Sequence, residues 1–271
     1  MSEALPATVA LQLWRLDGSA PSLLAPDHVV AEEPLDIRVE GRTVAVIMRT
    51  PGHERELAAG FLLSEGVIST ARDLFEISLC PGVGSSVVDV TLRQPDKVDF
   101  ERLSRHILTP GSCGICGKTS IAAALERHPS IQVRDGISIK RQVLFSLPAK
   151  QREAQEGFAC TGGSHAAALF DATGGLMDLK EDAGRHNAVD KISGAALLEN
   201  RLPLDQSILL LSGRISFELV QKALAARIPV IAAVGAPSSL AVSTAEEAGI
   251  TLCGFLRESR VNVYTHPGRI T

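Results

Sequence analysis

The stretch Ile208-Leu209-Leu210-Leu211-Ser212-Gly213-Arg214-Ile215-Ser216 decides the fold, because it ends one buried strand and opens a helix. Its apolar run predicts the strand, and Phe217, Val220 and Leu224 recur at helical spacing directly after it. A second apolar run at 229–234 predicts the next strand. Strands that alternate with helices indicate a layered α/β sheet with parallel strands, whose ligands bind at the carboxyl ends of the strands.

The same alternation continues on both sides of this unit, from about residue 163 to residue 271. A hairpin is predicted around Ala172-Thr173-Gly174-Gly175, followed by a helix that carries Val189 and Ile192 on one face. The remaining predictions are a helix at 240–248 and strands at 251–256 and 261–264. We therefore expect a larger α/β domain over 119–271, with a lead-in of two helical pieces, 140–145 and 150–156, that Pro148 interrupts.

The first part of the chain predicts a smaller mixed α/β domain over 1–108. Two alternating apolar segments flank Glu40-Gly41-Arg42 and indicate a hairpin. A helix is expected at 54–65, where Gly66 ends it, and two short strands at 75–79 and 87–92.

Composition narrows the class of protein. The 271 residues are 45% hydrophobic and carry a net charge of −4, which supports a large core and argues against a nucleic-acid partner. No apolar run approaches the roughly 20 residues of a membrane span, and the first residues lack the pattern of a signal peptide. We therefore expect a cytoplasmic protein without membrane contact, in which the five cysteines are reduced.

Two of these cysteines stand close together in a short loop, Thr109-Pro110-Gly111-Ser112-Cys113-Gly114-Ile115-Cys116-Gly117-Lys118. The glycines predict a mobile loop over 109–118 that a bulky partner can approach. Lys118 and the start of a following helix, expected at 120–127, could both lower the pKa of a thiol there.

This Cys113/Cys116 pair admits three functional interpretations. A zinc site needs about four ligands, and only His106, His128 or a distant cysteine could complete it, so we expect no metal. A thioredoxin-like disulfide site should lie between a first strand and a helix, whereas the glycines here suit a mobile loop. The third interpretation is a persulfide carrier, in which one thiolate accepts a sulfur atom and delivers it. The other cysteines, Cys80, Cys160 and Cys253, are expected to be small buried apolar residues.

Two strand-to-helix junctions carry arginine. Arg185 and His186 should stand at a helix start, where free N–H groups and the helix dipole favour an anion. An Asp182–Arg185 pair that caps the helix would explain the same residues without a ligand. At the second junction Arg214 could hold a phosphate, although Ser212 or Ser216 could equally be a simple cap.

Two further segments hold candidate binding residues. Thr161-Gly162-Gly163-Ser164-His165 could cradle a phosphate or admit the cysteine loop, with His165 as a candidate only. Near the end of the chain, Phe255 could stack on a base while Arg257 and Arg260 pair with phosphates. Taken alone, that last segment fits an ordinary polar strand end equally well.

The chain resembles the FdhD family, the formate dehydrogenase accessory sulfurtransferases, over nearly its whole length. The resemblance rests on motifs that occur in this order: Glu32-Glu33-Pro34-Leu35, Met48-Arg49-Thr50-Pro51-Gly52, Gly60-Phe61-Leu62-Leu63-Ser64-Glu65-Gly66, Cys113-Gly114-Ile115-Cys116-Gly117, Thr161-Gly162-Gly163-Ser164-His165, Asp182-Ala183-Gly184-Arg185-His186-Asn187, Ser212-Gly213-Arg214 and Phe255-Leu256-Arg257.

The resemblance implies a sulfur relay. A cysteine desulfurase would hand sulfur to Cys113 as a persulfide, with Cys116 as its partner, and the carrier would pass it to the bis-molybdopterin guanine dinucleotide molybdenum cofactor for formate dehydrogenase. The cofactor, bound as substrate, would contact Phe255, Leu256, Arg257, Glu258, Ser259 and Arg260, and by our own extension Arg185, His186 and Arg214. A homodimer is implied as well.

The family also implies a cytidine-deaminase-like fold in the larger domain. Zinc deaminases place a His-x-Glu at one junction and Pro-Cys-x-x-Cys at the next. This chain has His186-Asn187-Ala188 and Ser212-Gly213-Arg214-Ile215 there, so the fold is expected without zinc or deaminase chemistry. Two other functions remain open: a cofactor-binding chaperone without sulfur transfer, and a cytosolic dithiol oxidoreductase.

Overall fold

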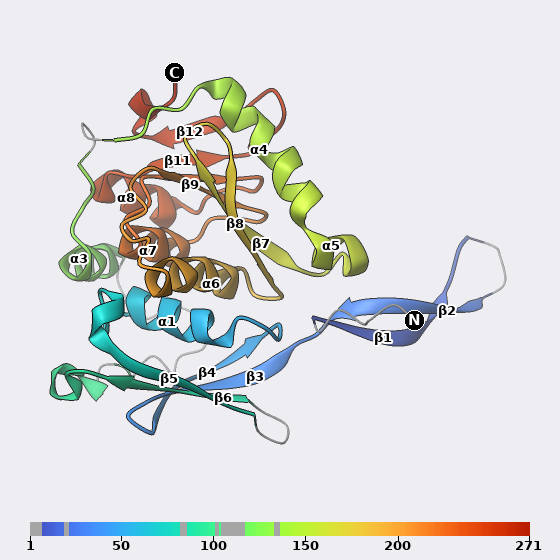
Figure 1. The fold of residues 1–271 in the computed structure, drawn as a ribbon. Helices are drawn as coiled ribbons and strands as arrows, with labels where there is room; N and C mark the ends of the chain where they lie inside the picture. The colour runs from blue at the N-terminus through green and yellow to red at the C-terminus, as the bar shows by residue number, and fades with distance from the viewer. Residues whose placement is uncertain (1–6, 19–21, 82–85, 101–102, 104–116, 133–135) are drawn as a thin grey trace.

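A computed structural model describes residues 7–18, 22–81, 86–100, 103, 117–132 and 136–271. Within these residues the strands form a large sheet, a small sheet and a two-stranded ribbon (Figure 1). The predicted boundary at residue 108 and most of the loop over 109–118 fall on residues outside the described ranges, and both stay predictions. Among the described residues, no helix is long and apolar enough to cross a membrane.

The large sheet has the strand order β12-β11-β10-β9-β7-β8. Its antiparallel hairpin β7–β8 is followed by three mutually parallel strands, and β12 runs antiparallel at the far edge. The strands are β7 (His165–Asp171), β8 (Leu176–Asp182), β9 (Ser207–Leu211), β10 (Val230–Ala233), β11 (Thr251–Gly254) and β12 (Asn262–Thr265). The predicted strand at 251–256 ends two residues early, because Phe255 adopts the left-handed conformation with φ of 54°.

Alternating side chains bury both faces of this sheet. Leu209 and Leu211 pack against α6 (Arg185–Leu198), α7 (Phe217–Ala225) and α8 (Ser239–Ala248), whereas Leu210 packs against α4 on the other face. The period of two along β9 therefore produces a three-layer α/β/α arrangement.

The helix α4 (Arg141–Ala154) corrects the prediction of two pieces broken at Pro148, because it runs through the proline without a break. The side chains of its residues Leu144 and Leu147 are fully buried. Proline removes one helical hydrogen bond, and the burial of this apolar face offsets that loss. A short helix, α5 (Glu156–Thr161), follows directly.

The small sheet has the order β4-β3-β6-β5 and packs on α1 (Glu54–Ser64), as Figure 1 shows. Its strands are β3 (Glu33–Val39), β4 (Arg42–Arg49), β5 (Leu74–Pro81) and β6 (Ser86–Leu92). The predicted hairpin, helix and two later strands of this part are all present. The remaining elements are α3 (Gly117–Arg127) and the single turns η1 (Ala71–Asp73), η2 (Pro95–Lys97) and η3 (Pro267–Arg269).

The two sheets are joined through a close crossing of α1 and α6. A methyl group added at Gly60 would lie 1.9 Å from the Asp190 carbonyl oxygen, and one at Gly194 would lie 1.8 Å from the Glu56 carbonyl oxygen. Only glycine lets the two backbones approach this closely.

Buried polar groups join the same layers. The Asp182 carboxylate pairs with Lys191 at 2.8 Å and accepts hydrogen bonds from the backbone N–H groups of Thr50 and Gly184. Lys191 also donates to the Thr50 carbonyl oxygen at 2.9 Å. Asp190, the residue before Lys191 on α6, accepts hydrogen bonds from Lys222.

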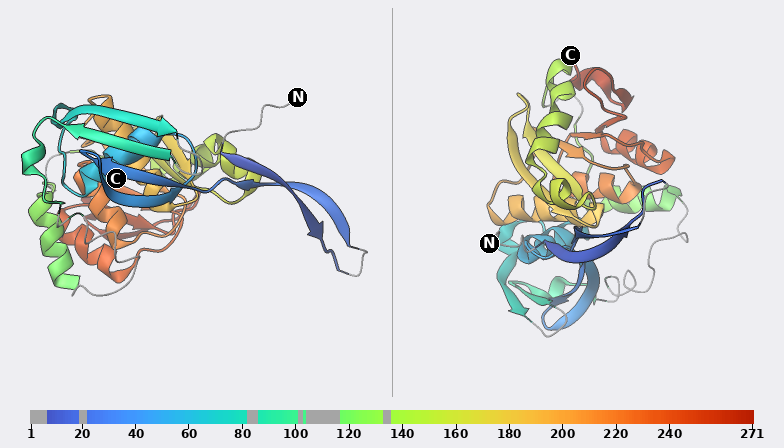
Figure 2. Two further views of the ribbon diagram at one scale, coloured as in Figure 1. Left: turned by 90° about the horizontal axis from the view of Figure 1, so that it is seen from below. Right: turned by 90° about the vertical axis from the view of Figure 1, so that its right-hand side faces the viewer.

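The ribbon of β1 (Thr8–Arg15) and β2 (Leu23–Val30) had no counterpart among the predictions. It projects away from the body of the molecule, as Figure 2 shows. Trp14 is 68% exposed and Leu24, opposite it in the register, 53%. These large apolar side chains therefore do not contribute to a core in the single chain, whereas the small Ala25 of β2 is buried.

Candidate functional site

The candidate site lies at one edge of the large sheet. The parallel strands β9, β10 and β11 end there, and the antiparallel registers bring the start of β7 and the end of β8 to the same edge. Each of the predicted junctions follows one of these strands. The segments around His165, Arg185, Arg214 and Phe255 therefore meet, as expected for a sheet of this kind.

Glycines let the backbones at this edge approach closely. A methyl group on Gly235 would lie 2.7 Å from the carbonyl oxygen of Gly213, and one on Gly213 would touch the His165 ring at 3.4 Å. The Phe255 N–H donates to the Gly235 carbonyl oxygen at 3.0 Å. The loops after β9, β10 and β11 thus form one continuous wall.

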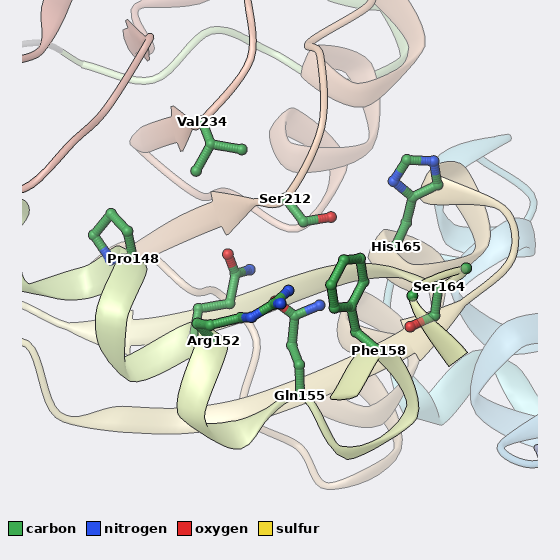
Figure 3. Close-up of a pocket in the computed structure, with 11 residues that line it drawn as sticks. Pro148, Arg152, Gln155, Phe158, Ser164, His165, Ser212 and Val234 are labelled. Carbon is green, nitrogen blue, oxygen red and sulfur yellow. The ribbon is translucent and has the colours of Figure 1, made fainter. Parts of the chain in front are cut away.

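A cavity of about 450 Å³ opens at this edge, between the sheet and the helices α4 and α5 (Figure 3). Among the described residues its lining contains a cation and several hydrogen-bonding groups but no carboxylate: Pro148, Gln151, Arg152, Gln155, Phe158, Gly162, Gly163, Ser164, His165, Ser212 and Val234. The Arg152 guanidinium lies 4.0 Å from the centre of the Phe158 ring. Such a lining suits an anionic or carbonyl-bearing ligand with a planar part.

Glu181, on β8, holds two walls of the cavity together. Its carboxylate accepts hydrogen bonds from the N–H groups of Gly157 and Phe158 at 2.7 and 2.8 Å, at the start of α5. It also accepts from the Ser164 hydroxyl at 2.5 Å. The carboxylate is satisfied by these donors, so it orders α5 and the Gly162-Gly163-Ser164 loop around the cavity.

Arg185 is the first residue of α6, at the helix terminus that favours an anion. The suggested Asp182–Arg185 pair is wrong, because Asp182 pairs with Lys191 inside the protein. Within the described part of the chain, the Nε of Arg185 is buried and has no hydrogen-bond partner. The guanidinium therefore has unused donor capacity at a helix N-terminus.

The two histidines beside Arg185 have lowered pKa values, which favours their neutral form. Burial, followed by the positive charges of Lys222 and Arg185, lowers the pKa of His186 to about 4. Burial and Arg185 also lower the pKa of His165. The His186 ring lies 3.8 Å from Glu218, but a neutral ring makes no ion pair, and its closer contact is the Ser216 hydroxyl at 3.1 Å.

This shifted pKa predicts a pH-dependent loss of stability. Between the ordinary value of 6.5 and about 4, the unfolded chain binds a proton at His186 that the folded chain does not. The free energy of unfolding therefore falls as the pH falls through this window. Because the ring is 35% exposed, this loss of stability should be smaller than for a fully buried histidine. A His186→Gln variant, which can keep the Ser216 contact, should lose less stability across the window in urea titrations. Equal losses in the two proteins would contradict the assignment.

The predicted binding residues divide into exposed and buried ones. Arg214, Glu258, Ser259 and Arg260 are exposed, and Phe255 is 41% exposed. Leu256 is fully buried in the core. The exposed Arg257 donates to the carbonyl oxygens of Val234 and Leu256, both at 2.8 Å, and so lies at the cavity wall.

Cys113 and Cys116 lie outside the described residues. The helix α3 begins at Gly117, immediately after Cys116, and so starts earlier than predicted. Burial was predicted correctly for Cys253, but Cys80 and Cys160 are exposed. In the described part of the chain, no group of three or more histidine, cysteine or acidic side chains could hold a metal ion.

The α4–α5 wall of the site was missed from the sequence. Arg152, Gln155 and Phe158 stand in a segment that was expected only to bridge two domains. The one available signal was the neighbouring Gly162-Gly163 pair, which was taken as a possible phosphate cradle.

The layered sheet and the cavity at its carboxyl edge define an α/β protein with a candidate ligand site. The chain belongs to the FdhD/NarQ family, whose model matches residues 30–271. It is 48% identical to the sulfur carrier protein FdhD of Mycolicibacterium paratuberculosis, over 92% of this chain and 94% of that protein. The identity is 51% with the protein of that name from Streptomyces coelicolor, over 90% and 89% of the two chains.

The whole fold also occurs in a solved structure. A protein of Desulfotalea psychrophila, described as a formate dehydrogenase accessory protein, superimposes with a TM-score of 0.78. The two chains are 26% identical, and the match covers 98% of this chain and all of the other.

Proposed function

We propose that this protein is a sulfur carrier that accepts persulfide sulfur on Cys113 and delivers it to a molybdenum cofactor for formate dehydrogenase. The observation that carries the proposal is the cysteine pair of the loop in a chain about half identical to named sulfur carriers over nine-tenths of its length. Family membership supports the sulfur-carrier role, and the loop supplies the only closely spaced thiols in the sequence.

The first step is a sulfur transfer between two thiols. The Cys113 thiolate attacks the outer sulfur of a cysteine desulfurase persulfide, forms a new S–S bond and breaks the old one. The desulfurase cysteine leaves as a thiolate, and no oxidant is needed. The start of α3 directly after Cys116 supports this step, because a helix N-terminus favours a thiolate. Cys116 is proposed as the partner thiol.

The proposed acceptor is the bis-molybdopterin guanine dinucleotide cofactor, bound as substrate. Its phosphates suit Arg185 at the start of α6, together with His186 and the exposed Arg214, Arg257 and Arg260. Phe255 and the cavity offer surfaces for a base. The absence of a carboxylate from the cavity lining supports an anionic occupant.

Four finer proposals accompany this function. The hairpin β7–β8 followed by α6, β9, α7 and β10 supports a cytidine-deaminase-like arrangement in the large sheet. Ala188 stands where zinc deaminases place their catalytic acid, and Ser212-Gly213-Arg214-Ile215 stands in place of their cysteine ligands, which supports a loss of deaminase chemistry. We also propose a cytoplasmic location, from the composition of the sequence, and a homodimer, from the family resemblance.

Replacing the carrier thiol should abolish the function. A Cys113→Ala protein loaded with cofactor should leave formate dehydrogenase inactive, because no other thiol occupies its place in the loop. Cys160→Ala is the matched control, since it removes an exposed cysteine beside the cavity, and it should activate the dehydrogenase as the wild type does. Full activation by Cys113→Ala would favour a cofactor chaperone without sulfur transfer. Reduction of a generic disulfide that needs both loop cysteines, without nucleotide binding, would favour an oxidoreductase.

A further inference from the structure

The cavity contains a buried donor that the protein does not use. Gln155, at the junction of α4 and α5, is 4% exposed and lines the cavity. Within the described residues, its side-chain Nε2 has no hydrogen-bond partner. A buried amide without a partner is destabilising, so its retention in a cavity wall points to an acceptor on a ligand.

The neighbouring glutamine, in contrast, has a structural role. Gln151, one turn earlier on α4, is equally buried and lines the same cavity. Its Nε2 donates to the carbonyl oxygen of Leu210 at 3.0 Å and so ties α4 to β9. The two amides therefore differ in one respect: that of Gln151 is satisfied by the protein, and that of Gln155 is not.

The surroundings of Gln155 fit a flat ring. Arg152 and Phe158 form a stacked pair in the same wall, and Arg152 is exposed, so its guanidinium has a face open to an aromatic base (Figure 3). Because Nε2 itself is shielded, the ligand reaches it through a small shift of neighbouring side chains. The wall thus combines a stacking surface with a donor that needs an acceptor.

We propose that Gln155 selects the base of the nucleotide in this cavity by donating to a ring carbonyl of a 6-oxopurine. This inference rests on the proposed function, which brings a guanine nucleotide to the protein. The oxygen at position 6 of guanine accepts a hydrogen bond, whereas the amino group of adenine at that position is a donor. With the Gln155 amide held in this orientation, its N–H faces the adenine amino group, so two donors stay unpaired and binding is weaker.

The test is nucleotide binding by the full chain, measured by calorimetry with GDP, IDP and ADP. The three probes share ribose and diphosphate, and only GDP and IDP carry the 6-oxo group. The wild type should bind GDP and IDP with similar affinity and ADP at least tenfold more weakly. Gln155→Met should bring the three affinities within about threefold of one another.

The matched control is Gln151→Met, which should keep the preference for 6-oxopurines. Thermal unfolding separates the two roles. Gln155→Met should melt no lower than the wild type, because it removes an unpaired buried donor, and Gln151→Met should melt lower, because it breaks the bond to Leu210.

Two results would overturn the inference: a wild type without preference between GDP and ADP, or a Gln155→Met protein that keeps the preference. The proposed function is measured separately, by sulfur on Cys113 and by activation of formate dehydrogenase. A protein that carries sulfur but binds GDP and ADP equally would therefore refute the role of Gln155 alone.

Discussion

Replacing Gly194 with alanine is expected to destabilise the protein by about 3 kcal/mol or more, at the upper end for overpacked cores. The new methyl group would lie 1.8 Å from the carbonyl oxygen of Glu56 and 2.7 Å from the Gly60 nitrogen. Both are backbone atoms of α1, so no side-chain rotation relieves the clash and the helices must separate. Helix propensity alone predicts the opposite, a gain of about 1 kcal/mol from glycine to alanine. The sign of the change therefore distinguishes packing from propensity.

Urea denaturation of the two proteins measures this effect. Gly268→Ala is the control, since a methyl group there meets no atom within 4 Å and the backbone is not left-handed. Its unfolding free energy should change by less than about 1 kcal/mol. A Gly194→Ala protein as stable as the wild type would show that α1 and α6 do not cross as described.

Replacing Lys191 with methionine should cost about 3–5 kcal/mol, as for other buried pairs that lose one partner. Lys191 is 1% exposed and its partner Asp182 is fully buried. The change leaves the Asp182 carboxylate without its cation and the Thr50 carbonyl oxygen without its donor. Because Thr50 follows β4 and Asp182 ends β8, the loss weakens the contact between the small and large sheets.

Arg201→Met is the control for this prediction. Arg201 follows α6, is 30% exposed and pairs with Glu199, which is 60% exposed, and at 3.5 Å with Asp178, so its removal should cost less than that of the fully buried Lys191. A double variant, Asp182→Asn with Lys191→Met, should lose less than the sum of the two single losses, because it leaves no unpaired charge. Additive losses would mean that the two groups do not interact.

The sequence predicted the large sheet well because its apolar periods are strong. The run at 208–211 could be buried on both faces only as a central strand, and the helix spacing of Val220 and Leu224 is unambiguous. The ribbon was missed because several of its large apolar side chains, such as Leu11 and Trp14, are exposed, so the segment lacks the pattern of a strand with one buried face. The prediction of a helix break at Pro148 was wrong because burial of the apolar face of α4 outweighs the loss of the helical hydrogen bond that proline removes.

The candidate site was predictable only in part. Residues that follow strands, such as Arg185 and Arg214, could be placed at one edge from topology alone. The α4–α5 wall could not, because nothing in the order of residues shows that Arg152 and Phe158 reach the cavity. Nor did the spacing of residues reveal that Asp182 pairs with Lys191 rather than with Arg185, because the pairing depends on which side chains the fold buries together.

The central claim is that Cys113 carries the sulfur, and intact mass spectrometry tests it most directly. The protein is incubated with a cysteine desulfurase and cysteine, then weighed and mapped by peptide digestion. The account predicts an added mass of one sulfur atom, located on Cys113 and removed by a thiol reductant. An unchanged mass, or sulfur located only on Cys80, Cys160 or Cys253, would contradict it.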